Sequence, residues 1–170
     1  NSLKNSKKFF DNGADKILIN SSTYKSEEIV NDIADYFGSQ AISIGVDYKR
    51  NNEIIELYSN CGRTLEKISF EGHLENLEKM NCGEIILNSI DNDGNGAGLD
   101  LKIKSMVKEN FSKPILLMGG AGKPEHFSEG LKVDLISGIV TANLFNFLGP
   151  GLKSVRAKLT TDGVNIAKFD

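Results

Sequence analysis

Short apolar runs, rich in β-branched residues, alternate with longer amphipathic segments along the whole chain. The runs predict strands, and the amphipathic segments predict helices because their apolar residues recur every three or four positions. Strands that are apolar throughout are typical of a parallel sheet covered by helices. We expect strands at residues 16–20, 41–47, 84–89, 115–118 and 135–141. We expect helices at residues 2–12, 24–37, 66–80, 100–110 and 151–162, and one more that begins at Pro124.

This pattern, one leading helix and five strand–helix units, permits two folds. The second unit also contains a hairpin, with its turn expected at residues 50–52 and its returning arm at 54–58. A flavodoxin-like open sheet contains about five units, whereas a TIM barrel contains eight and needs about 250 residues. The 170 residues are enough for one core and few for two. We therefore expect a single domain over residues 1–170, and periodicity alone leaves both folds open.

Composition narrows the classes of partner. The net charge of −3 gives no reason to expect nucleic acid or an anionic membrane, and no apolar stretch approaches the roughly 20 residues of a membrane span. Cys61 and Cys82 stand apart, and His73 and His126 are expected at helix flanks or the surface rather than as ligands. We expect a reduced, cytoplasmic protein without metal or cofactor. The first residue is Asn1 rather than Met, which favours a fragment or a processed chain.

Glycines follow the strand at residues 115–118, where either fold would place its active site. The run 119–122 (Gly-Gly-Ala-Gly) lets the backbone approach a ligand, and the helix start after it presents N–H groups and a partial positive charge. The next strand ends in Thr141-Ala142-Asn143. This arrangement favours a phosphate site between the last two strands, and a flexible turn is the alternative.

Asp47 ends an apolar strand, where a catalytic carboxylate would stand. The alternative is a structural Asp that pairs with Lys49 or Arg50, or that caps the turn. Residues 91–95 (Asp-Asn-Asp-Gly-Asn) resemble the start of a calcium loop. The twelfth position of that loop is Lys102 rather than an acid, which argues against calcium.

Together, these segments resemble the cyclase subunit of imidazole glycerol phosphate synthase. The similarity covers nearly the whole chain, in order and with few gaps. The strings that carry it are Gly13-Ala14-Asp15-Lys16 through Asn20, Phe37-Gly38-Ser39-Gln40-Ala41 through Asp47-Tyr48-Lys49-Arg50, Gly83-Glu84-Ile85-Ile86-Leu87 with Ser89-Ile90-Asp91 and Asp93-Gly94, and Gly119-Gly120-Ala121-Gly122-Lys123 with Glu125-His126-Phe127.

The resemblance implies a TIM barrel of which this chain supplies the fourth to eighth strand–helix units. It also implies a glutaminase partner, whose ammonia passes through the barrel and attacks a ribulosyl ketone with a phosphate at each end. Asp47 would be one of two catalytic carboxylates. The implied substrate and phosphate residues are Asn20, Asn88, Asp93, Gly94, Gly119, Gly120, Ala142 and Asn143. Lys16 and Glu84 would belong to the charged gate at the ammonia entrance.

The chain departs from the family pattern around the expected substrate. The family's other catalytic aspartate ends the first strand, which this chain does not contain. Asn88 stands in place of Thr, while Met118 and Asn143 each stand in place of Ser. A Met cannot donate the hydrogen bond that a Ser donates. Two alternatives therefore stay open: a paralogue that delivers ammonia for amidation of a surface-polysaccharide sugar, and a non-catalytic half-barrel that binds phosphate. Exposed sheet edges would favour self-association.

Overall fold

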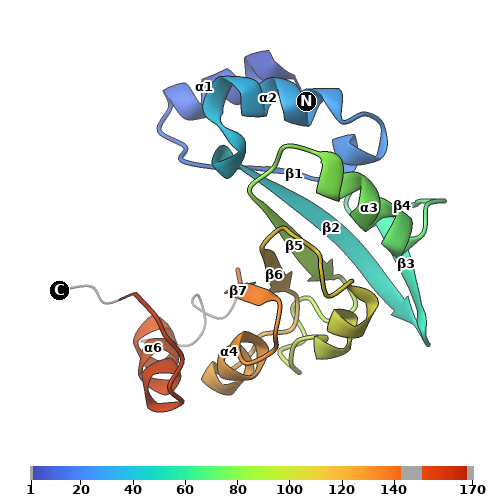
Figure 1. Cartoon of the computed structure of the whole chain (residues 1–170). Coiled ribbons are helices and arrows are strands. Elements are labelled where there is room, and N and C mark those ends of the chain that lie inside the picture. Colours follow the sequence, from blue (N-terminus) through green and yellow to red (C-terminus); the bar gives the residue numbers. More distant parts are fainter. Residues whose placement is uncertain (1, 143–150, 168–170) are drawn as a thin grey trace.

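A computed structural model describes residues 2–142 and 151–167 of the chain (Figure 1). Strands alternate with helices as expected, and short 3₁₀ helices (η) occur in addition. In order they are α1 (Leu3–Asp11), β1 (Ile17–Ile19), η1 (Ser21–Tyr24), α2 (Glu28–Phe37), η2 (Ser39–Ala41), β2 (Ile42–Asn51), β3 (Ile54–Ser59), β4 (Thr64–Leu65), α3 (Phe70–Lys79), β5 (Glu84–Ser89), η3 (Leu101–Met106), β6 (Ile115–Met118), α4 (Pro124–Leu131), β7 (Ile136–Val140) and α6 (Gly151–Thr161). No helix in these ranges is long and apolar enough to cross a membrane.

The parallel strands stand side by side in chain order, β1-β2-β5-β6-β7. A flavodoxin-like sheet would reverse direction at a switch point, with a strand order such as 2-1-3-4-5. Strands that follow one another around the sheet are typical of a barrel. The strand order therefore decides between the two folds that periodicity left open. The β3 strand runs antiparallel to the last residues of β2 and forms the expected hairpin.

Alternation along β2 gives the sheet two chemically different faces. Ile42, Ile44 and Val46 are buried against the helices, which Figure 1 shows around the outside of the strands. Ser43 and Asp47 point the other way. We call this second surface the inner face; it comprises residues 43, 45 and 47 of β2 and their register partners 84, 86 and 88 of β5. The inner face carries Asp47, Glu84 and Asn88, which the sequence marks as functional.

The main core lies between the sheet and α2 and α3. Its buried residues include Val30, Ile33, Ile42, Ile44, Val46, Phe70, Leu74, Leu77, Ile85 and Leu87. A smaller cluster of Phe127, Val155 and Leu159 joins α4 to α6. The helix starts follow their sequence signals, because the Ser69 hydroxyl accepts the Gly72 N–H at 3.1 Å and Pro124 occupies the first turn of α4.

Several expected elements differ from the structure, among them the helix expected at 66–80, which begins at Phe70. The segment 100–110 forms only the short 3₁₀ helix η3 (Leu101–Met106), and the Asp100 side chain before it binds Arg50 rather than a backbone N–H of the segment. The expected helix 24–37 begins only at Glu28, after η1, with the Ser26 hydroxyl accepting the Glu28 N–H. The hairpin turn lies at residues 52–53 rather than 50–52, since β2 continues to Asn51.

The expectation that both histidines lie at helix flanks or at the surface is wrong. His73 is only 1% exposed and His126 is also buried. His73 stands three residues after Phe70 and four before Leu77, so it shares the apolar face of α3. Its ring stacks on Tyr24 with 4.2 Å between ring centroids. The helical spacing would have predicted this burial.

Candidate functional site

Asp47 and Asn88 meet on the inner face at the carboxyl ends of β2 and β5. They are register partners, and the Asn88 side-chain amide donates a hydrogen bond of 2.9 Å to Asp47 Oδ1. The Asn88 Oδ1 atom is buried and has no hydrogen-bond partner among the described residues. A buried acceptor without a donor is costly, so it is well suited to receive an N–H or O–H from a ligand.

Asn20 follows β1 and lies beside Gly45 of β2, two residues before Asp47. Its side-chain nitrogen would be 3.3 Å from a Cβ at residue 45, so Gly45 leaves it room on the inner face. The Asn20 Oδ1 atom is also buried and unpartnered within the described ranges. Asn20 and Asn88 therefore both bring an unsatisfied acceptor to the end of the sheet where Asp47 stands.

The proposed structural alternative for Asp47, a pairing with Lys49 or Arg50, does not occur. Because β2 extends through Asn51, Asp47 and Arg50 lie on opposite faces of the strand. Arg50 binds Asp100 instead, at 2.8 Å between Nη2 and Oδ2. Lys49 lies over the ring of Tyr58, a cation–π contact of 5.1 Å to the ring centroid. The Asp47 carboxylate is thus available to the inner face.

Two glycine-containing loops lie against each other at the same end of the sheet. Gly119 and Gly120 have φ angles of 93° and 100°, which a residue with a side chain rarely adopts. The Gly98 N–H donates to the Gly120 carbonyl at 2.9 Å. A Cβ on Gly120 would overlap the Gly98 carbonyl oxygen, and one on Gly122 would overlap that of Gly96. The loop that carries Asp93 is therefore held in backbone contact with the glycine run.

The buried His126 supports both loops. Its Nδ1 atom accepts the Gly122 N–H at 3.1 Å, and a Cβ on Gly98 would lie 3.7 Å from its Nε2 atom. The Gly122 amide is thus used within the protein. An anion at the glycine run would therefore bind N–H groups other than that of Gly122, such as those of the residues before it. Sequence reasoning missed this role, although His126 stands only four residues after Gly122.

The remaining predicted substrate residues stand around these loops. Asp93 and Gly94 are exposed, and the Asp93 N–H donates to the Ser89 carbonyl at 3.0 Å, which turns the loop back over the end of β5. Ala142 is exposed two residues after β7. Asn143 lies outside the described residues.

Lys16 and Glu84 meet at the opposite, amino-terminal end of the strands. Their side chains form an ion pair of 2.8 Å, and the Ser43 hydroxyl donates to Glu84 at 2.5 Å. Burial alone would raise the pKa of Glu84, but the hydrogen bonds from Lys16 and Ser43 outweigh it and lower the pKa. The two gate residues are therefore in contact, with the carboxyl group held in its charged form.

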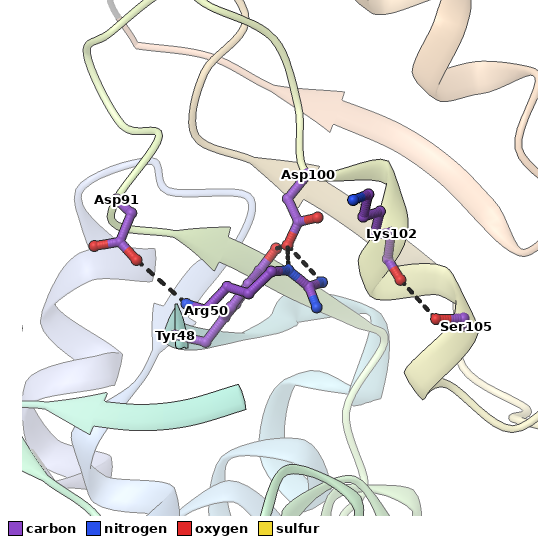
Figure 2. A network of polar contacts seen from close by, with 6 residues as sticks. All are labelled: Tyr48, Arg50, Asp91, Asp100, Lys102 and Ser105. Carbon is purple, nitrogen blue, oxygen red and sulfur yellow. Dashed lines mark hydrogen bonds and ion pairs between the residues drawn. The ribbon is translucent and has the colours of Figure 1, made fainter. Parts of the chain in front are cut away.

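A polar network that sequence reasoning missed lies on the outer side of β2 (Figure 2). The Arg50 Nε and Nη2 atoms and the Tyr48 hydroxyl all donate to Asp100 Oδ2, at 3.0, 2.8 and 3.1 Å. Burial, and next the Asp100 charge, raise the pKa of Tyr48, so its hydroxyl stays a donor. No local sequence pattern predicts this network, because 50 residues separate Arg50 from Asp100.

Comparison with known proteins identifies relatives along nearly the whole chain. A family model described as "Histidine biosynthesis protein" matches residues 1–148. A putative imidazole glycerol phosphate synthase subunit hisF2 from Parasynechococcus marenigrum (strain WH8102) is 33% identical over 155 residues, which are 91% of this chain and 58% of the relative. The imidazole glycerol phosphate synthase subunit HisF from Hydrogenobaculum sp. (strain Y04AAS1) is 32% identical over 96% of this chain and 66% of the relative. The HisF subunit from Pyrobaculum aerophilum is 32% identical over 97% of this chain and 65% of its own length. The chain thus spans about three-fifths to two-thirds of these curated relatives.

Proposed function

We propose that this chain, which belongs to the histidine biosynthesis protein family, supplies the fourth to eighth strand–helix units of the cyclase subunit of imidazole glycerol phosphate synthase. The observation that carries the proposal is the group at the carboxyl end of the inner face. There Asp47 and Asn88 share a hydrogen bond beside two interlocked glycine loops. The names of the relatives support the same reaction.

In the proposed reaction Asp47 exchanges a proton with the substrate. Asn88 donates to Oδ1 and fixes the orientation of the carboxylate, so the second oxygen is left to face the substrate. Ammonia from a glutaminase subunit adds to the ribulosyl ketone, the adduct loses the ketone oxygen as water, and the resulting imine cyclises and splits to imidazole glycerol phosphate and an aminoimidazole carboxamide ribotide. A carboxylate positioned as acid–base catalyst contributes about 10²–10⁴-fold to such a step.

The two phosphate groups of the substrate define the two ends of the proposed site. We assign one end to the side of Asn20 and the other to Gly94, Gly119, Gly120, Ala142 and Asn143. Backbone N–H groups next to a helix start suit a phosphate, and α4 begins two residues after Gly122. Lys16 and Glu84 would form part of the entrance for ammonia, where the glutaminase docks. We place the protein in the cytoplasm.

The proposal is tested by the substitution Asp47→Asn in a complete barrel that contains this chain, with ammonia as nitrogen donor. The kcat should fall at least about 100-fold because the proton-transfer group is lost, while KM changes little. Asp35→Asn, which neutralises an exposed carboxylate on α2, is the matched control and should leave kcat unchanged. Normal turnover by Asp47→Asn would show that Asp47 is structural.

A second candidate is the paralogue that delivers ammonia for amidation of a surface-polysaccharide sugar. The observation that favours it is Met118, which is the register partner of Asn88 on β6. A thioether at this position offers no donor to a phosphorylated or hydroxylated substrate. Under this alternative the complete wild-type protein binds a glutaminase but does not turn over the bis-phosphorylated ribotide. A phosphate-binding protein without any turnover is the third alternative, and it would show neither activity.

A further inference from the structure

The Arg50–Asp100 network connects β2 to both ends of one loop. The Arg50 side chain donates two hydrogen bonds to Asp100 Oδ2, as Figure 2 shows, and the Arg50 backbone N–H donates to Asp91 Oδ2 at 3.2 Å. Asp91 is the second residue and Asp100 the last residue of the segment 90–100 between β5 and η3, which carries Asp93. One arginine therefore holds the segment at its start and at its end.

This segment in turn sets the position of the glycine run. Between the two anchors, Gly98 donates its N–H to the Gly120 carbonyl, and the two backbones leave no space for a Cβ at Gly120 or Gly122. Because the two segments touch through their backbones, a shift of one would displace the other. The contacts thus lead from β2 through Asp100 and Gly98 to Gly120 without a gap.

The burial of the pair distinguishes it from an ordinary surface ion pair. The Arg50 and Asp100 side chains are 21% and 10% exposed, whereas the exposed pair Lys108–Glu75 is 59% and 54% exposed. Solvent screens the latter and leaves it little energetic weight. The planar guanidinium presents Nε and Nη2 to the same carboxylate oxygen, an orientation that a lysine cannot reproduce.

We propose that Arg50 and Asp100 are positioning residues that hold residues 91–98 against Gly119 and Gly120, and so set the affinity of the proposed phosphate site without touching the phosphate. This inference rests on the proposed function, which places a phosphate at these loops. Under this inference, a side chain on the outer side of β2 affects phosphate binding at the carboxyl end of the sheet.

The test uses the 170-residue chain and inorganic phosphate, with binding followed through the amide NMR signals of Gly119 and Gly120. Arg50→Met should raise the phosphate Kd at least about tenfold, because a half-buried, charge-assisted anchor of the loop is lost. Hydrogen exchange of the Gly98 amide should accelerate by a similar factor. Arg50→Lys keeps the charge and should restore part of the affinity. Lys108→Met removes the exposed pair and should leave the phosphate Kd and the Gly98 exchange rate unchanged.

The outcomes separate this inference from the proposed function. If the wild-type chain binds phosphate at these amides and Arg50→Met binds it equally well, or leaves the Gly98 exchange rate unchanged, the positioning role is wrong and the proposed function stands. If phosphate leaves the wild-type amides unperturbed, the phosphate site of the proposed function fails and the positioning role fails with it. Asp100→Asn provides a second variant that keeps the side-chain volume, and the thermal unfolding midpoint verifies that each variant is folded.

Discussion

The face of a helix or strand on which a side chain lies decides whether that side chain is buried, and burial in turn changes the pKa of a titratable group. His73 lies on the buried face of α3, and burial lowers its pKa from 6.5 to about 4. Its Nε2 atom has no partner in the described part of the chain, and its ring stacks on Tyr24. The neutral imidazole is therefore the form that the folded protein accommodates.

The stability of the protein should consequently depend on pH through His73. Between pH 6.5 and about 4 the unfolded chain binds a proton on this residue that the folded chain does not bind. The free energy of unfolding therefore falls as the pH falls through this window, by up to about 3 kcal/mol. In urea titrations across this range, His73→Phe keeps a ring beside Tyr24 and should lose less stability on acidification. Parallel curves for the two proteins would show that His73 does not titrate in this window.

Site residues could be predicted from the sequence where their position in a strand or helix follows from the local pattern. Asp47 could be found because it directly follows a run of buried residues and therefore ends a strand, and the register then adds Asn88. The Arg50–Asp100 pair could not be found, because its two members meet only after the sheet has formed. The His126 contact with Gly122 is local, but a histidine next to an apolar residue is too common a pattern to predict one hydrogen bond.

At the level of elements, prediction succeeded where the local signal is strong on its own. The strands at 84–89 and 115–118 have the predicted bounds, because apolar runs flanked by polar residues or Pro leave little choice of end point. The segment 100–110 failed, although Ile103, Val107 and Phe111 have helical spacing and are all buried. Its chain direction is set by the Asp100 anchor, and tertiary contacts then override a weak helical preference.

The α3 helix illustrates an element whose start depends on one residue. The Ser69 hydroxyl accepts the Gly72 N–H, which would otherwise lack an intrahelical partner. Ser69→Ala should therefore lower the free energy of unfolding by about 1 kcal/mol, measured by urea denaturation at neutral pH. Ser154→Ala, on the exposed side of α6, is the control and should have almost no effect. Equal midpoints for Ser69→Ala and the wild type would contradict the capping role.

The molecule as a whole is an open part of a barrel. Within the described ranges β1 pairs only with β2, and β7 pairs only with β6, so the parallel sheet has an edge on each side. Leu18 of β1, the register partner of Ser43, is 58% exposed. Unpaired strand edges beside exposed apolar side chains promote pairing with another chain. We propose that this chain either associates with itself or pairs with the remaining strands of a barrel.

Self-association can be tested at the exposed edge. In sedimentation at increasing concentration the chain should form dimers or larger species. Leu18→Lys should raise their dissociation constant at least about tenfold, because a buried leucine contributes about 1.5–3 kcal/mol. Leu152→Lys changes a similarly exposed leucine on the helix α6, which is not a strand of the sheet, and should have no such effect. A monomer at every concentration, with one sharp thermal transition, would contradict the proposal.

The close fit of the two glycine loops also bears on how such a protein can diverge. A Cβ on Gly120 would overlap the Gly98 carbonyl oxygen and one on Gly122 that of Gly96, so the backbone of one loop limits which residues the other can hold. An insertion or a bulky replacement in one loop demands a compensating change in the other, 20 or more positions away in the sequence. Relatives that acquire a new substrate should therefore exchange both loops together, and a graft of one loop alone from a relative should yield a protein whose second loop no longer fits.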